Sequence, residues 1–349
     1  MNPNILLTEK CNQSCNYCFA KQKMRRAEKE EMSLEDVRKI IYFLKKNSQE
    51  EIRLMGGEPT LHPQFKEIVD FILSQGLKIR LFTNGLFSPE LTDWLNKKGI
   101  FIKYMINLTT PAFLLETSER KRLIENNLKI LKKNAEIIAA ITIDNLDFKD
   151  EPIINFLKKI EIKFVRLGIA NVPIDSNWLK WEQYKDFGLI VTSFINKLRK
   201  TSVAKINFNC GFTPCMFTQK QIIDFQEAGI KINGWGCDGK KGAFDVSTDL
   251  SIFPCFILEN FKAKNLFDFK NLKTAKKFLE NLVNYSIFNL SLFVLEHCKN
   301  CSYYKTKCPG PCFGNFAINP GDKEPFKNFQ NTFYFKFIYN LLYLFRNHL

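Results

Sequence analysis

Six short apolar segments, each followed by a helical pattern, constrain the fold of this chain more than any other feature. The predicted strands cover residues 4–8, 51–55, 78–82, 101–107, 136–143 and 162–168. Helical periodicity follows at residues 33–44, 63–74, 89–97, 118–134, 152–159 and within 177–199. This alternation predicts a parallel sheet with helices on its outer face. Because a closed eight-unit barrel needs about 250 residues, six units in roughly 200 residues predict a partial, open (β/α)6 barrel of the TIM type.

The alternation is predicted to end near Ser202, which divides the chain into three parts. Residues 1–200 are predicted to form the barrel, and residues 201–325 a cysteine-rich module with little core of its own. Residues 326–349 are rich in aromatic side chains and are predicted to form a C-terminal helix. We expect this helix to pack against the barrel, with contact to a membrane surface as the alternative.

Composition excludes several classes of protein. Hydrophobic residues make up 45% of the 349, which favours a large folded core over disorder. The net charge is +15, but no basic run is interleaved with aromatic residues, which argues against nucleic-acid binding. No signal peptide and no apolar run of about 18 residues is visible, so we expect a cytoplasmic protein without a transmembrane segment. Eleven cysteines in such a chain indicate metal rather than disulfides.

Cys11, Cys15 and Cys18 follow the first predicted strand with the spacing Cys-x3-Cys-x2-Cys. An iron–sulfur cluster normally takes four cysteine ligands, so a loop that supplies three leaves one iron free to bind another molecule. The alternative is a zinc site, but structural zinc takes four ligands and the first histidine of the chain is His62. The spacing therefore favours a cluster with an open iron.

The segment CNQSCNYCF, which includes Tyr17, resembles the cysteine loop of radical S-adenosylmethionine enzymes. The resemblance implies a 4Fe–4S cluster, held by these three cysteines, whose open iron binds S-adenosylmethionine (SAM). In that family an electron from the cluster cleaves SAM and releases a 5′-deoxyadenosyl radical. The turn Gly56-Gly57-Glu58 resembles the family's GGE motif, which binds the methionine ammonium group. Its two glycines let the backbone approach a ligand closely.

Polar residues at or near the ends of later predicted strands are further candidates for the SAM site. They are Thr83, Asn84, Asn107, Asn145 and Arg166. In such sheets, ligands bind at the carboxyl ends of the strands. The resemblance implies that Thr83 and Asn84 line the cofactor pocket and that Asn107 contacts the ribose. The sequence Asn107-Leu108-Thr109-Thr110 stands where the family usually has Ser-x-Asp-Gly.

Eight cysteines in the second half form another candidate metal region. They are Cys210, Cys215, Cys237, Cys255, Cys298, Cys301, Cys308 and Cys312. Their pattern resembles the SPASM extension of radical SAM enzymes, which holds auxiliary iron–sulfur clusters. It departs from that extension by having six residues between Cys301 and Cys308 instead of five, by Leu250 in place of a glycine, and by lacking a cysteine after Cys312.

The resemblance implies one or two auxiliary clusters. The family pattern places Cys298, Cys301 and Cys308 on one cluster, and it places Cys312 with Cys237 and Cys255 on the other. Eight thiolates would ligate two clusters fully, and Cys210 and Cys215 are candidates for the ligands that the downstream pattern lacks. Zinc remains the alternative for this region, since Cys-x2-Cys suits either metal.

SPASM enzymes act mostly on peptides and proteins, so the resemblance implies a radical SAM oxidoreductase that crosslinks, epimerises or oxidises such a substrate. Asp238, directly after Cys237, is a candidate base. Expected partners are the peptide and a flavodoxin- or ferredoxin-type electron donor. Because only ten residues precede Cys11, either a separate leader-binding protein recognises the substrate, or the substrate is recognised in another way, or it is not a peptide of this kind. The alternatives are an enzyme of small-molecule or cofactor biosynthesis and a metal-stapled nucleic-acid-binding protein.

Overall fold

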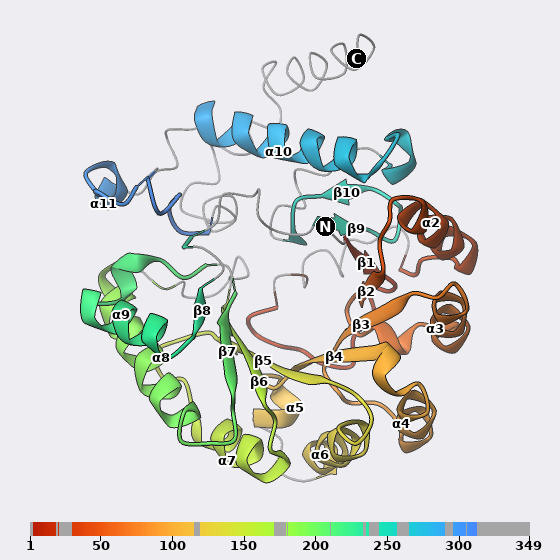
Figure 1. Ribbon diagram of the computed structural model, residues 1–349, viewed down its shortest axis with the longest axis horizontal. Helices are drawn as coiled ribbons and strands as arrows, with labels where there is room; N and C mark the ends of the chain where they lie inside the picture. The colour runs from red at the N-terminus through yellow and green to blue at the C-terminus, as the bar shows by residue number, and fades with distance from the viewer. Residues whose placement is uncertain are drawn as a thin grey trace.

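The computed structural model describes residues 3–18, 20, 30–114, 119–170, 179, 181–209, 211–232, 235–236, 244–256, 265–289, 296–304 and 306–312. These residues form a 10-stranded sheet that curves into an open arc, with helices on its outside (Figure 1). Across the sheet, the order is β10 (Ile252–Phe253), β9 (Asp245–Val246), β1 (Asn4–Leu6), β2 (Glu51–Met55), β3 (Lys78–Thr83), β4 (Ile102–Asn107), β5 (Ile137–Ile143), β6 (Phe164–Ile169), β7 (Lys205–Phe208) and β8 (Lys231–Ile232).

The strands from β9 to β8 pair in parallel, and β10 pairs antiparallel with β9. Among the described residues no ladder joins β8 to β10, so the barrel is open. All parallel strands therefore present their carboxyl ends at one rim, which is where such sheets bind ligands.

Helices follow most of the strands and cover the outer face of the arc (Figure 1). They are α2 (Leu34–Lys46), α3 (Phe65–Ser74), α4 (Pro89–Asn96), α5 (Pro111–Leu114), α6 (Glu119–Leu131), α7 (Glu151–Ile160), α8 (Tyr184–Leu198) and α9 (Gln219–Glu227). Two further helices, α10 (Leu272–Asn289) and α11 (Glu296–Lys299), come after the last strand. Within the described residues, no helix is long and apolar enough to cross a membrane.

The strand pattern shows how the sequence builds this arrangement. In β5, Ile137, Ala139, Ile141 and Ile143 are buried, whereas the residues between them are half-buried. Side chains of a strand point alternately to its two faces, so one face packs under the helices and the other lines the inside of the arc. Helices α2, α4 and α9 begin at capping residues; Ser33, for example, accepts the Asp36 N–H at 3.1 Å before α2.

The predicted partial barrel and its six βα units are confirmed, with element ends that differ by a few residues. The expectation that the alternation ends near Ser202 is wrong, because β7, α9 and β8 continue it and β9 and β10 extend the other edge. These late strands are only two to four residues long, too short for a clear alternating pattern. The sheet thus crosses the boundary predicted at residue 200, and the division into domains stays a prediction. The predicted helix at 326–349 lies outside the described residues.

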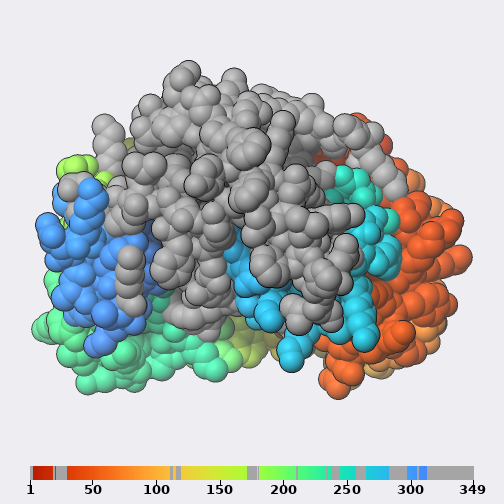
Figure 2. Space-filling model, turned by 90° about the horizontal axis from the view of Figure 1, so that it is seen from above, coloured from red at the N-terminus to blue at the C-terminus, as the bar shows by residue number. Residues whose placement is uncertain are grey.

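Helix α10 joins the two halves of the molecule. In Figure 2 it lies (in cyan) between the orange N-terminal helices and the blue segment that contains residues 296–312. The N–H of Leu272, at its start, donates to Oδ1 of Asn47 at the end of α2, at 3.0 Å. The C-terminal cysteines are therefore carried to the side of the molecule that holds α8 and α9 (Figure 1).

Candidate active site and auxiliary cysteine centre

Cys11, Cys15 and Cys18 lie on one loop at the carboxyl end of β1. The loop turns on itself, since the Cys18 N–H donates to the Cys15 carbonyl at 3.1 Å. Burial raises the pKa of Cys11 to about 11 and that of Cys15 to about 12, and the nearby Cys18 thiol adds to both shifts. The three thiols therefore share one half-buried loop. This donor set fits an iron–sulfur cluster with one iron left open, because thiolates are its protein ligands and the loop supplies three.

Gly56 and Gly57 bring the end of β2 against the base of this loop. The Gly57 N–H donates to the Thr8 carbonyl at 2.8 Å, and the Glu58 N–H donates to the Lys10 carbonyl at 2.7 Å. A Cβ on Gly56 would overlap the carbonyl oxygen of Thr8, and a Cβ on Gly57 that of Lys10. The two glycines therefore allow the turn after β2 to pack closely against the backbone of the cysteine loop.

Glu58 is buried, with 1% of its surface exposed. Its Oε1 accepts the hydroxyls of Thr60 and Thr83 at 2.7 Å each, and its Oε2 accepts the Asn84 N–H at 2.8 Å. Burial raises the pKa of this carboxyl, and the hydrogen bonds oppose the shift. In the described part of the chain no lysine, arginine or histidine pairs with Glu58. A buried carboxylate without a cation is costly, so the site suits a ligand that brings a positive charge.

Asn84 ties the end of β3 to the cysteine loop. Its Nδ2 donates to Oδ1 of Asn12 at 2.8 Å, and its Oδ1 accepts the Leu86 N–H at 2.8 Å. Asn12 also donates to the Leu86 carbonyl at 2.9 Å, and Arg120 donates to the Asn12 carbonyl at 2.7 Å. Asn84 therefore holds the loop in place, in addition to its backbone contact with Glu58.

Tyr17 ties the loop to the end of β4. Its hydroxyl donates to the Thr109 carbonyl at 2.8 Å and accepts from Nδ2 of Asn107 at 3.1 Å. Oδ1 of Asn107 accepts the hydroxyl of Thr109 at 2.8 Å. Burial raises the pKa of Tyr17, so the hydroxyl keeps its proton for these contacts. The neighbouring Thr110 hydroxyl is buried and has no hydrogen-bond partner among the described residues.

Two predicted site residues lie outside this network. Asn145, after β5, is exposed, and its Nδ2 donates to Oδ1 of Asp144 at 3.0 Å. Arg166, on β6, donates to Oδ1 of Asn209 just after β7. The structure therefore brings together the predicted residues from β2, β3 and β4 with the cysteine loop, and it places these two on the following strands.

Sequence reasoning missed Asn12, Thr109 and Arg120 as parts of the site. Asn12 stands between two of the cysteines and Thr109 follows Asn107 closely, so their places beside predicted site residues were the available signal. Arg120 is 108 residues away from its partner Asn12, and nothing in its surrounding sequence indicates this contact.

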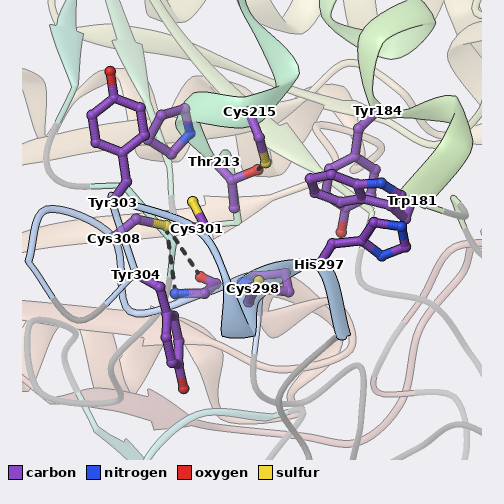
Figure 3. Close-up of a pocket in the computed structure, with 13 residues that line it drawn as sticks. Trp181, Tyr184, Thr213, Cys215, His297, Cys298, Cys301, Tyr303, Tyr304 and Cys308 are labelled. Atoms are coloured by element: carbon purple, nitrogen blue, oxygen red, sulfur yellow. Dashed lines mark hydrogen bonds between the residues drawn. The ribbon is translucent and has the colours of Figure 1, made fainter.

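A second group of thiols surrounds a cavity on the side of α8 and α11. Cys215, Cys298, Cys301 and Cys308 line it, and it is partly open to solvent. In Figure 3 the thiols lie between Tyr303 and Tyr304 on one side and Trp181, Tyr184 and His297 on the other. Burial raises the pKa of Cys298 and of Cys308 to about 11, and the other thiols of the group add to both shifts.

Aromatic side chains fix the wall of this cavity. The rings of Trp181 and His297 stack with centroids 4.6 Å apart, which joins the segment before α8 to α11. Burial raises the pKa of Tyr184, and the thiols of Cys215 and Cys298 add to the shift. The sequence did not indicate this wall, because Trp181 and Tyr184 lie more than 100 residues before His297.

The remaining C-terminal candidates have different surroundings. Cys312 is buried, and Cys255 is half-buried between Phe253 and Phe256, which pack in one apolar cluster with Leu6 and the partly buried Cys18. Cys210, Cys237 and Asp238 lie outside the described residues. Within the described ranges, no three histidine, cysteine, aspartate or glutamate side chains converge closely enough to hold a single metal ion.

Residues 5–160 match the Radical SAM superfamily. This part of the chain is a radical SAM domain. It contains the three-cysteine loop, the GGE turn and the hydrogen bonds that join them to β3 and β4. The cysteines of the C-terminal part fit an auxiliary cluster of the SPASM type.

Curated relatives of the radical SAM domain have several activities. An S-adenosylmethionine-dependent nucleotide dehydratase of Selenomonas ruminantium is 35% identical over 107 residues, which cover 28% of this chain and 38% of that protein. A radical SAM cyclopropyl synthase of Paramaledivibacter caminithermalis is 22% identical over 353 residues, covering 89% of this chain and 67% of that enzyme. The GTP 3′,8-cyclase of Aquifex aeolicus is 26% identical and covers 53% of this chain and 57% of that enzyme. The matches to the dehydratase and the cyclase thus span less than two thirds of those proteins.

Two solved structures share the fold over most of the chain. The structure of anSMEcpe with bound AdoMet and Kp18Cys peptide has a TM-score of 0.65 and 18% identity, and the match covers 100% of this chain and 99% of that one. SuiB of Streptococcus suis bound to S-adenosylmethionine has a TM-score of 0.59 and 16% identity, covering 90% of this chain and 73% of that one. At these identities the likeness concerns the fold.

Proposed function

We propose that this chain cleaves SAM by reduction and uses the resulting radical to modify a peptide or protein. The observation that carries the proposal is the extent of the fold it shares with anSMEcpe. That match covers 100% of this chain, the cysteine-rich part included, and anSMEcpe was solved with a peptide bound. By sequence, the cyclopropyl synthase of Paramaledivibacter caminithermalis matches 89% of the chain and the cyclase of Aquifex aeolicus 53%. When bound at the three-cysteine loop, a 4Fe–4S cluster supplies the electron that cleaves SAM to a 5′-deoxyadenosyl radical.

The residues around the loop have separate tasks in this proposal. The Glu58 carboxylate receives the ammonium group of SAM, because it is buried and has no cationic side chain as partner in the described part of the chain. The Thr110 hydroxyl is available to the ribose, whereas the Asn107 side chain is taken up by Tyr17 and Thr109. Asn84 and Tyr17 hold the loop that carries the cysteines against the ends of β3 and β4.

We further propose that the reaction is an oxidation. The substrate would then lose a hydrogen atom to the adenosyl radical and a further proton and electron, which is a two-electron oxidation for each SAM. An auxiliary cluster held by the C-terminal cysteines would be the electron acceptor, and a side chain the base. Asp238 stays the candidate base. A flavodoxin- or ferredoxin-type donor, a leader-binding protein and a cytoplasmic location stay predictions of the sequence.

A nucleotide substrate is the second candidate. The nucleotide dehydratase of Selenomonas ruminantium has 35% identity, and several GTP 3′,8-cyclases are similar to about half of the chain. Under this alternative, the similarity within the radical SAM domain reflects a shared nucleotide substrate as well as the shared use of SAM.

The experiment compares these substrates on the same protein. The chain is reconstituted with iron and sulfide without oxygen and given SAM and dithionite. It then receives GTP, CTP or synthetic peptides encoded by short reading frames next to its gene. We expect a peptide to raise 5′-deoxyadenosine formation several-fold and to change its own mass. Stimulation by a nucleotide, with no peptide modified, would overturn the peptide proposal.

A further inference from the structure

Cys215 stands apart from the C-terminal run in sequence but joins it in space. It lines the same cavity as Cys298, Cys301 and Cys308 (Figure 3). The four thiols therefore border one pocket, with more than 80 residues of chain between the first and the second of them.

We propose that Cys215 is the fourth ligand of an auxiliary iron–sulfur cluster that it shares with Cys298, Cys301 and Cys308. It takes the place that the SPASM pattern gives to a cysteine beyond the C-terminal run. The inference rests on the iron–sulfur chemistry of the proposed function and is independent of its substrate.

The backbone around Cys215 holds this thiol in place. Cys215 lies in the 3-10 turn Pro214–Met216, and the turn packs on α8 at Gly188, where a Cβ would overlap the carbonyl oxygen of Met216. The Thr213 hydroxyl lies 3.0 Å from the Cys215 sulfur. A residue without a side chain on α8 thus lets the turn approach closely enough for its thiol to face the cavity.

Gly236 connects this turn region to the C-terminal run. Its N–H donates to the Phe212 carbonyl at 2.6 Å, and a Cβ on Gly236 would overlap the carbonyl oxygen of Gly310. The Gly310 N–H in turn points to the Cys308 sulfur at 3.4 Å. Segments near residues 212, 236 and 310 are therefore in backbone contact, which fixes Cys215 relative to Cys308.

The spacing of the thiols suits a cluster better than a single ion. Zinc binds cysteine sulfur at about 2.3 Å, so four zinc-bound sulfurs crowd around one point. No such convergence occurs among the described residues, and the thiols instead border a pocket that is partly open to solvent. A 4Fe–4S cluster takes four cysteine thiolates, one for each iron.

Cys312 is the competing fourth ligand within the run. It is buried, but it does not belong to the described lining of the cavity, whereas Cys215 does. Under this proposal, Cys312 is therefore not a ligand of this cluster and stays a candidate ligand together with the other C-terminal cysteines.

Alkylation of the cysteines tests the ligand set without measuring activity. The anaerobically reconstituted full chain is treated with iodoacetamide before and after its iron is removed by a chelator, and each cysteine is followed by mass spectrometry. We expect Cys215, Cys298, Cys301 and Cys308 to be protected together and to become reactive together. Alkylation of Cys215 in the iron-loaded protein, while the other three stay protected, would overturn the proposal.

Iron content gives a second, independent result. In a background where Cys11, Cys15 and Cys18 are replaced by alanine, only auxiliary iron is counted. Cys215→Ala is expected to remove about four irons per chain, or to keep them with an altered EPR spectrum. Cys215→Ser, which conserves the size of the side chain, is expected to do the same. Unchanged iron and EPR in both variants, with a change in Cys312→Ala instead, would assign the position to Cys312. Zinc in place of iron at these four thiols would also overturn the proposal.

Discussion

The two cysteine centres of this molecule are built in opposite ways. Cys11, Cys15 and Cys18 lie within eight residues on one loop, and the ends of β2, β3 and β4 hold that loop through Gly57, Asn84 and Asn107. The second centre draws its thiols from segments far apart and holds them through contacts between loops. The first centre has three sulfurs and the second has four. The number of thiolates determines whether SAM can bind, because only a cluster with three protein ligands has an iron left for SAM.

The largest expected effect is the loss of SAM cleavage in Cys15→Ala. Removing one of three thiolates leaves the loop unable to hold its cluster. We expect no 5′-deoxyadenosine above the protein-free background when the variant is given SAM and dithionite. Ser14→Ala, at an exposed position of the same loop, is the matched control and should keep the activity. Wild-type activity in Cys15→Ala would remove the loop from the reaction.

The next effect separates the supports of the two centres. A Cβ at Gly57 meets the Lys10 carbonyl and one at Gly188 meets the Met216 carbonyl, so alanine at either position must push two backbone segments apart. Overpacking of this kind lowers the free energy of unfolding by about 1–3 kcal/mol. We expect Gly57→Ala to reduce iron at the first centre and Gly188→Ala to reduce it at the second.

Gly168→Ala is the control for these two changes. The nearest atom to its added Cβ is Nδ2 of Asn209 at 3.6 Å, an ordinary contact. Its urea unfolding midpoint should match the wild type. Equal unfolding midpoints in all three variants would contradict the close backbone contacts described for both centres.

Glu58→Gln should weaken SAM binding while leaving the second centre intact. The change removes a buried negative charge that faces no cation in the described part of the chain. A hydrogen bond to a charged group contributes about 1.5–3 kcal/mol, so the Kd for SAM should rise by at least about tenfold. Glu51→Gln, at the other end of β2 and paired with Arg80, is the control for calorimetric titration. Unchanged affinity in Glu58→Gln would remove this carboxylate from the SAM site.

The smallest expected effect comes from Tyr17→Phe. The change deletes the hydroxyl that joins the loop to Asn107 and Thr109 and leaves the ring in place. Loss of such hydrogen bonds should lower the free energy of unfolding by about 1 kcal/mol. Thermal unfolding measures it, with the exposed Tyr42→Phe as control. Destabilisation equal to that of the control would mean that Tyr17 does not anchor the loop.

The barrel and the first centre were predictable from the sequence because their signals are local. Alternating apolar segments predicted β1 to β6, and the spacing of Cys11, Cys15 and Cys18 predicted a three-ligand loop. The short strands β7 to β10 were missed because two to four residues carry little periodicity.

The second centre shows the limit of local signals. Cys215 was only one of two candidates for a missing ligand, since spacing along the chain says nothing about which distant loops meet. The structure distinguishes it through Gly188 and Gly236, whose lack of side chains permits the backbone contacts. The stacking of Trp181 on His297 could not be predicted for the same reason, because it depends on a tertiary contact between distant segments.

EPR spectroscopy of the reduced protein, before and after addition of SAM, tests the difference between the centres most directly. We expect SAM to change the spectrum of the wild type, because the three-thiol cluster has an open iron. In the variant that lacks Cys11, Cys15 and Cys18, we expect the remaining clusters to give the same spectrum with and without SAM. A spectrum of the wild type that SAM leaves unchanged, or a change that persists in this variant, would contradict the assignment of SAM to the three-cysteine loop.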